Sequence, residues 1–177
     1  FSSVLGFRDH LETEQLRKVG FRFFFSEGRE DVERCTELGV SQVLPTPSWQ
    51  LDRGRFENFL GKQARTLGVD VRDAAMVRAI DLDAGSAHAV SFEQDGATHT
   101  LAARWVVDAS GRAGLLKRKL DLAASNDHDF NAVWLRVDGF VDPNAWATDV
   151  PWLTRSAPPH RWRSTNHMCG PGYWFLL

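Results

Sequence analysis

The hydrophobic positions along the chain follow two periods, and the clearer helical period runs from Asp52 to Leu67. Apolar residues recur there at intervals of three and four, Asp52 precedes the stripe as a capping residue, and Gly68 follows it. This pattern predicts an amphipathic helix that begins after Asp52 and ends before Gly68. A less regular stripe predicts another helix over residues 4–19, which Gly20 would end.

Alternating and aromatic runs predict strands along much of the remaining chain. Strands are predicted over residues 21–25, 69–71, 75–82, 88–92, 98–107, 133–137 and 173–177. Asp95-Gly96 is a dipeptide typical of a two-residue hairpin turn between adjacent strands. Prolines from Pro143 to Pro159, with tryptophans among them, indicate an irregular segment. Its tryptophans either line a site for a flat ligand or anchor a loop without regular structure.

The stretch around Asp108 combines the features of a ligand site at a strand end. Trp105 to Val107 is an uninterrupted apolar run, which predicts a strand buried on both faces of a sheet. Asp108 follows, then a glycine turn and a short apolar helix over residues 115–120. Ligands of open α/β sheets bind at the carboxyl ends of strands, and the free first amides of a helix bind anions.

Two interpretations of Asp108 follow from this pattern. An ionised aspartate offers acceptor oxygens to the hydroxyls of a sugar or ribityl chain, and the glycines beside it would let a ligand approach the backbone. Alternatively, Asp108 is the N-cap of the helix that follows, and its role is purely structural.

Val-Val-Asp-Ala-Ser-Gly-Arg at residues 106–112 resembles the second flavin-binding motif of the FAD-dependent monooxygenase and halogenase superfamily. Other segments resemble the flavin-dependent, tryptophan-halogenase-like branch of this superfamily, namely residues 5–10, 20–25, 51–56, 164–167 and 170–174. The resemblance implies an α/β fold: part of a Rossmann-like FAD-binding domain with an attached antiparallel β-sheet substrate portion. Residues 1–122 are expected to belong to the FAD-binding domain, with a β-meander, and residues 123–177 to begin the substrate portion.

The resemblance also implies FAD as the cofactor and identifies residues that would contact it. The cofactor-binding residues expected from the motif are Asp108, Ser110, Gly111, Arg112 and Gly114. In the family, this aspartate hydrogen-bonds the ribityl chain, and the glycines admit the cofactor to the backbone.

Arg53 is the remaining cofactor candidate. It follows Asp52 at the first turn of the predicted helix, where the superfamily carries an Asp-Arg pair near the phosphate or adenine end of the flavin. A guanidinium has the charge and the donor fork to bind a pyrophosphate. The alternative is a surface arginine paired with a nearby acid.

The activity implied is that of an FAD-dependent oxidoreductase with a small aromatic substrate. Reduced nicotinamide or a flavin reductase would supply electrons, and a flavin hydroperoxide would either hydroxylate the substrate or oxidise a halide. The chain has no Gly-x-Gly-x-x-Gly turn, so we interpret it as an internal fragment, inactive alone. The segment that carries the catalytic lysine of halogenases is also missing, so no catalytic residue is assigned.

One departure separates the chain from halogenases. Tyr173 to Leu177 stands near the Trp-x-Trp-x-Ile-Pro motif of that family without its second tryptophan, isoleucine and proline. Two alternatives therefore remain: a flavin reductase of the same fold that does not activate oxygen, and a non-enzymatic β-rich module that binds a carbohydrate or flat ligand.

Composition narrows the class of partner. The formal net charge is −2 and basic residues form no stripe, which argues against nucleic acid. No apolar run is long enough to span a bilayer, and no Cys/His motif typical of a metal site occurs. Two distant cysteines and the lack of a signal peptide are compatible with the cytoplasm.

Overall fold

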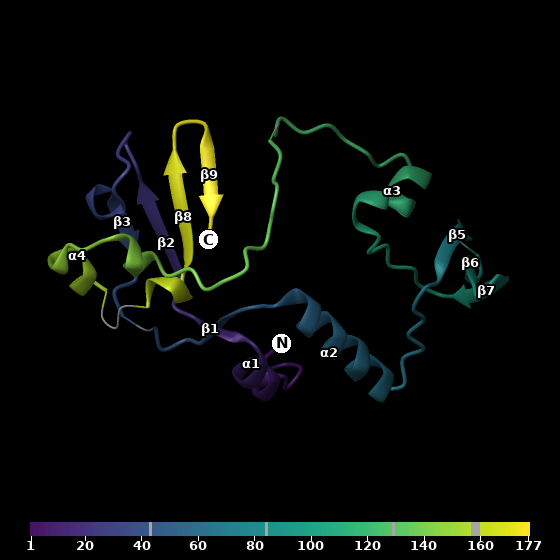
Figure 1. Ribbon diagram of the computed structural model, residues 1–177. Coiled ribbons are helices and arrows are strands. Elements are labelled where there is room, and N and C mark those ends of the chain that lie inside the picture. Colours follow the sequence, from purple (N-terminus) through teal and green to yellow (C-terminus); the bar gives the residue numbers. More distant parts are fainter. Residues whose placement is uncertain (43, 84, 129, 157–159) are drawn as a thin grey trace. The chain divides into compact units, whose positions relative to one another are not determined.

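The computed structural model describes residues 1–42, 44–83, 85–128, 130–156 and 160–177 (Figure 1). The chain divides into two compact units, which are described separately. The first unit contains Phe1–Lys62 and Arg136–Leu177, and the second contains Gln63–Leu135. These units divide the chain differently from the expected functional boundary between residues 122 and 123, which stays a prediction.

The first unit is built on a four-stranded sheet. Its strands, in spatial order, are β3 (Thr36–Gly39), β2 (Phe21–Phe25), β8 (Thr165–Gly170) and β9 (Tyr173–Leu176). β2 and β8 run parallel, whereas β3 and β9 pair antiparallel with their neighbours. The predicted strands over residues 21–25 and 173–177 are therefore confirmed, and the Gly-Pro-Gly turn joins β8 to β9.

Alternation along β2 assigns its side chains to two different environments. Phe24 and Arg22 lie on one face and are both buried. Phe23 pairs with His167 of β8 and so lies on the opposite face, beside Phe21. The aromatic strand is thus fully buried on one face, whereas the other face exposes Phe21 and Phe25 on either side of Phe23.

The other elements of the first unit include one helix that the sequence predicted well and one that it did not. They are α1 (Arg8–Glu14), β1 (Leu16–Lys18), η1 (Val32–Arg34), β4 (Ser48–Gln50), α2 (Arg53–Thr66), η3 (Pro143–Trp146), α4 (Val150–Thr154) and η4 (Arg161–Arg163). The last four residues of α2, from Gln63 onward, belong to the second unit. Asp52 Oδ1 accepts the amide of Arg55 at 3.2 Å, which confirms Asp52 as the cap of α2. The helix predicted over residues 4–19 forms only over Arg8–Glu14, and residues 16–18 pair with β4 instead. Pairing with a distant segment outweighs an irregular helical pattern.

The proline-rich segment anchors the first unit through Trp152. This side chain is fully buried, and the guanidinium carbon of Arg161 lies 3.7 Å from its ring centre. The anchoring interpretation is therefore confirmed for Trp152, whereas Trp146 is about half exposed. Pro158 and Pro159 lie outside the described residues.

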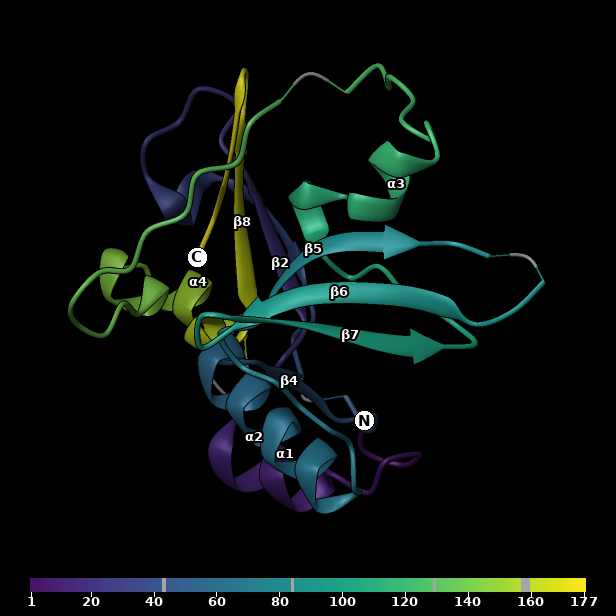
Figure 2. The same cartoon turned by 90° about the vertical axis from the view of Figure 1, so that its right-hand side faces the viewer.

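The second unit contains an antiparallel meander. β5 (Met76–Asp81), β6 (His88–Gln94) and β7 (Ala97–Ala103) lie side by side in chain order (Figure 2). Asp95 and Gly96 both have positive φ, +52° and +76°, as a type I′ turn requires. The predicted hairpin is confirmed. Beyond it lie η2 (Gly111–Ala113) and α3 (Leu115–Lys119), and the predicted helix over 115–120 is confirmed.

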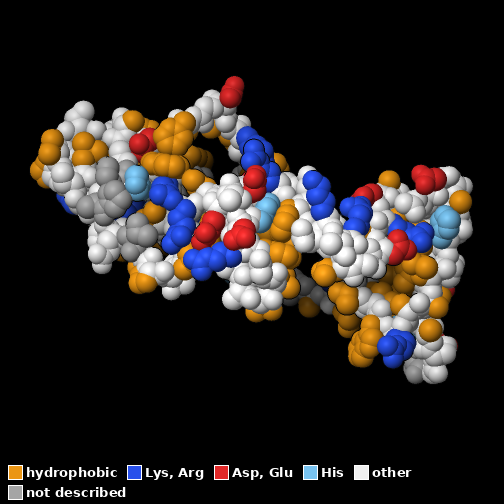
Figure 3. Space-filling model, turned by 90° about the horizontal axis from the view of Figure 1, so that it is seen from below, with side chains coloured by type: hydrophobic (Ala, Val, Ile, Leu, Met, Phe, Trp, Pro, Cys, Tyr) orange, Lys and Arg blue, Asp and Glu red, His pale blue; other side chains and the backbone are white. Residues whose placement is uncertain are grey.

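The strands predicted over residues 69–71 and 133–137 are wrong, and the strand predicted over residues 98–107 is confirmed only as far as Ala103, because residues 105–107 form no strand. β7 ends at Ala103 and is an edge strand, so the expected central strand is absent there. The side chain of Trp105 is 86% exposed and that of Val133 is 90% exposed, and hydrophobic side chains also reach the face shown in Figure 3. The physical reason is that a strand requires a partner, and no described segment pairs with these runs.

The described part of the chain is thus a mixed α/β structure with several antiparallel sheets. Among those residues, none of the helices combines the length and apolar character needed to cross a bilayer. Within the same ranges, no group of three or more His, Cys, Asp or Glu side chains is arranged to bind a metal ion.

Candidate functional site

The side chain of Asp108 joins the two ends of the turn that precedes α3. Its Oδ1 accepts the amide of Ser110 at 2.9 Å, and its Oδ2 accepts the amide of Leu116 at 2.8 Å. Both carboxylate oxygens therefore hold backbone groups, one at the start of the turn and one in the first turn of the helix. This arrangement fixes the carboxylate in one orientation.

The same turn uses backbone amides that were expected to remain free. Ser110 Oγ accepts the amide of Leu115 at 3.2 Å, and Asp108 takes the amide of Leu116. The amides of Leu115 and Leu116 are therefore not free to bind an anion, because the protein's own side chains already accept their hydrogen bonds. Gly114 occupies the N-cap position, so Asp108 provides the hydrogen bond of a cap from an earlier residue.

These hydrogen bonds stabilise the ionised form of Asp108. The hydroxyl of Ser110, then the amides of Ser110 and Leu116, lower the pKa of the Asp108 carboxyl below its ordinary value. An aspartate is already ionised at neutral pH, and the lowered pKa keeps this group ionised further into acid. Because a carboxylate has about four acceptor positions, it retains acceptor capacity beyond the two amides. The geometry suits a ligand that presents hydroxyl donors.

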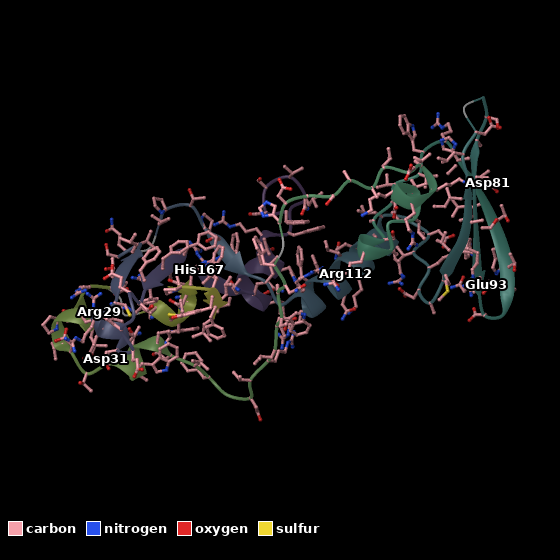
Figure 4. The ribbon with its side chains drawn as sticks, turned by 90° about the horizontal axis from the view of Figure 1, so that it is seen from above. Arg29, Asp31, Asp81, Glu93, Arg112 and His167 are labelled. Atoms are coloured by element: carbon pink, nitrogen blue, oxygen red, sulfur yellow. The ribbon has the colours of Figure 1, made fainter. Side chains whose placement is uncertain are left out.

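Two glycines in the turn differ in how open they are. Gly111 has φ of +62°, and a Cβ there would meet no atom within 4 Å, so the space beside its backbone is open. Gly114 has φ of +49° and lies close to Lys117, whose Cε is 3.0 Å from the corresponding Cβ position. Only Gly111 therefore offers an open approach to the backbone. Arg112, labelled in Figure 4, is exposed between them.

Arg53 and the Asp108 turn belong to different units of the chain. Arg53 is the first residue of α2, in the first unit, whereas the other five candidates belong to the second. Its side chain is 85% exposed and binds Glu57, with 2.5 Å between Nη2 and Oε1. The surface-pair interpretation is thus observed, and a ligand at Arg53 would compete with Glu57.

Two shallow hollows accompany these segments. One, of about 330 Å³, lies at the start of α2 and is lined by Asp52 and Arg55 among others, although not by Arg53. The other, of about 240 Å³, lies between β5 and α3, with Arg78, Leu115 and Lys119 in its lining. Neither is lined by Asp108 or by residues 110–114. The predicted site is therefore an exposed turn rather than a closed pocket.

His167, labelled in Figure 4, was not predicted as a site residue, and its ring lies against the rings of Phe21, Phe23 and Trp174. The residue is only 5% exposed, its ring stacks on Phe23 at 4.4 Å, and its Nδ1 accepts the indole N–H of Trp174 at 2.9 Å. Burial, and then the charge of Lys18, lower the pKa of His167. Its position beside the aromatic strand becomes apparent only through the pairing of β2 with β8.

Comparison with known families assigns the chain to one of them. Residues 27–141 match the model of the tryptophan halogenase family. The chain belongs to this family. The resemblance inferred from the sequence motifs is thereby confirmed. The matched range contains the Asp108 turn and Arg53, so all the candidate residues lie within it.

Solved structures support the same fold. The chain is similar to a triple mutant of the flavin-dependent brominase Bmp2, with 24% identity and a TM-score of 0.54 over 67% of this chain and 28% of that one. It is also similar to CmlS, a flavin-dependent halogenase, with 22% identity and a TM-score of 0.54 over 66% of this chain and 21% of the other.

A third structure is the myxobacterial chondrochloren halogenase CndH, described as a new variant of FAD-dependent halogenases. It shares 25% identity with a TM-score of 0.50, over 63% of this chain and 26% of the other. The chain therefore spans only about a quarter of the length of these structures. A comparison with curated proteins found no match.

Proposed function

We propose that this chain is part of an FAD-dependent, halogenase-like oxidoreductase that acts on a small aromatic molecule. Family membership and the flavin dependence of the three structures named above support the cofactor and the class of enzyme. In this proposal, residues 1–122 belong to a Rossmann-like FAD-binding domain and residues 123–177 to an antiparallel substrate portion.

The observation that carries the proposal is the ionised, oriented carboxylate of Asp108 beside the open backbone of Gly111. A ribityl chain presents several hydroxyl donors along one edge, and the remaining acceptor positions of Asp108 fit them. Gly111 would let the chain approach the backbone without a side chain in between. Ser110 holds the carboxylate in place, while Gly114 gives the turn its left-handed residue before α3.

Arg53 and Arg112 would provide positive charge for the phosphates of FAD. Arg53 would exchange its exposed partner Glu57 for a pyrophosphate oxygen, and Arg112 is exposed beside the Asp108 turn. A guanidinium binds phosphate oxygens in a bidentate fork, which also orients the group.

Bound FAD would supply the redox chemistry, with electrons from NAD(P)H or a partner reductase and with oxygen as oxidant, leading to halogenation or hydroxylation of the substrate. The contribution of this chain is to bind and orient the cofactor. We assign no catalytic acid or base to it.

The test is a titration of the purified protein with FAD, followed by flavin absorbance and fluorescence. Asp108→Ala should abolish binding. Asp83→Ala is the matched control, because Asp83 also accepts a backbone amide, that of Gly85 at 2.8 Å, in the same unit but outside the motif. The control should bind FAD as the native protein does.

Circular dichroism of each variant would separate loss of the site from loss of the fold, since Asp108 also holds the start of α3. A folded Asp108→Ala variant that binds FAD as tightly as the native protein would overturn the proposal. Once FAD binding is established, substrate-dependent oxygen consumption would distinguish an oxygenating enzyme from a flavin reductase of the same fold.

A further inference from the structure

The hydrogen bond between Trp174 and His167 determines which tautomer the imidazole adopts. The indole Nε1 is a donor only, so His167 Nδ1 must present a lone pair at the far end of the 2.9 Å contact. The neutral ring therefore carries its proton on Nε2. This Nε2 is buried and has no hydrogen-bond partner among the described residues.

The same hydrogen bond orients an otherwise exposed ring. Trp174 lies on β9, the edge strand of the four-stranded sheet, and is 64% exposed. Its N–H is the one polar group of the side chain, and it is donated to His167. The imidazole is in turn held by its stack on Phe23, with 16° between the ring planes. A buried side chain thus fixes the orientation of a surface indole.

We propose that His167 is a positioning residue: the neutral imidazole holds the Trp174 indole, and protonation of the imidazole releases it. A protonated imidazole carries a hydrogen on both nitrogens, so Nδ1 no longer accepts the indole N–H. Two donors would then face each other, and the ring of Trp174 would turn away. The contact is therefore lost in acid as one discrete event.

The surroundings of His167 oppose protonation. Phe21 and Phe23 of β2 and Trp174 of β9 lie against the ring and carry no charge. Lys18 of β1 is the charged group that acts on it, and its Nζ lies 3.9 Å from the ring centre of Phe21. Burial and this ammonium both lower the pKa of His167, which supports a release midpoint below the ordinary histidine value.

The test is an NMR titration of ¹⁵N-labelled tryptophan side chains, in which Trp174→Phe assigns the indole signal of Trp174. In the native protein, that signal should shift in a single step with a midpoint below about 6.5. His167→Gln should abolish the step while keeping the neutral-pH signal, because the glutamine oxygen accepts the indole N–H and does not titrate. Lys18→Gln should raise the midpoint, because it removes the opposing charge.

A Trp174 signal that does not change between about pH 8 and the pH at which acid unfolds the protein would overturn the inference, as would a step that persists in His167→Gln. His167→Leu, which cannot accept the indole N–H, should show the released signal at every pH. For the proposed enzyme, the result would be an oriented indole on the predicted substrate portion, and only this consequence rests on the proposed function. The titration needs no flavin, so failure to bind FAD would leave its outcome unchanged.

Discussion

Arg161 binds Glu37 through two parallel hydrogen bonds, Nε to Oε1 at 2.8 Å and Nη2 to Oε2 at 3.2 Å, between side chains that are 0% and 5% exposed. Glu37 also accepts Nη1 of Arg22 at 2.5 Å. One carboxylate thus pairs with two buried guanidiniums. It also joins β3 to β2 and to the segment that carries Trp152, because Arg161 donates to the carbonyl of Trp152.

Glu37→Gln is expected to destabilise the first unit strongly. Removing one partner of a buried ionic cluster leaves uncompensated charge, which costs about 3–5 kcal/mol. Urea unfolding should show a lower midpoint with an unchanged slope. The control is Glu57→Gln, whose carboxylate pairs with Arg53 on the exposed face of α2 and should cost less than about 1 kcal/mol. Equal losses in the two variants would show that the buried cluster does not stabilise the unit.

Two glycines should respond to alanine with opposite signs. Gly96 has φ of +76° in the hairpin turn, where an L side chain is strained, so Gly96→Ala should cost about 1–2 kcal/mol. Gly54 lies in the first turn of α2, and its Cβ would meet Asp52 Oδ1 at 3.4 Å, an ordinary contact. Gly54→Ala should therefore stabilise by about 0.5 kcal/mol through reduced backbone entropy. Thermal unfolding of both variants measures the change in stability relative to the native protein. A stabilising Gly96→Ala would contradict the type I′ turn.

Asp108 should make the stability of the second unit sensitive to acid. Hydrogen bonds from Ser110 and Leu116 hold the pKa of Asp108 below its unfolded value of about 3.9. The stabilisation is therefore fully present above about pH 3.9 and is lost as pH falls through the lowered pKa. In denaturant unfolding from neutral pH downward, native protein and Asp108→Asn should differ most at neutral pH and converge in acid.

Asp95→Asn is the control for loss of one carboxylate, because Asn-Gly favours the same hairpin turn as Asp-Gly. A difference between native protein and Asp108→Asn that stays constant down to about pH 2 would show that these hydrogen bonds do not stabilise the ionised form.

Arg53→Gln should weaken FAD binding if Arg53 contacts the pyrophosphate. A lost hydrogen bond between charged groups costs about 1.5–3 kcal/mol, which corresponds to a dissociation constant that is roughly 10- to 150-fold higher. Arg65→Gln is matched to it, since Arg65 lies on the same helix and also pairs with an exposed acid, Asp73. Fluorescence titration with FAD compares the two. Parallel weakening in both would assign the effect to general charge rather than to Arg53.

Local patterns predicted the elements whose stability is local. The helix after Asp52, the Asp95-Gly96 hairpin and the strands on either side of it follow from capping, periodicity and turn chemistry, which act within a few residues. The tryptophan halogenase resemblance was also present in the sequence, because its motif requires particular residues at fixed spacing.

Tertiary structure decided everything that depended on a distant partner. Residues 105–107 have the apolar pattern of a buried strand and form none, since no described segment pairs with them. Residues 16–18 were predicted to be helical, but they form a strand that pairs with β4. The burial of Glu37 between two arginines, and of His167 beneath Trp174, arises from the β3-β2-β8-β9 pairing.

The sequence by itself thus determined the family, the local elements and the residues of the Asp108 turn. It did not determine that this turn uses its own side chains to satisfy the helix amides, or that a histidine orients an exposed indole. Hydrogen-bond partners depend on which segments lie side by side in the folded chain. A sequence pattern shows which residues could form such bonds, but not which distant segments pair.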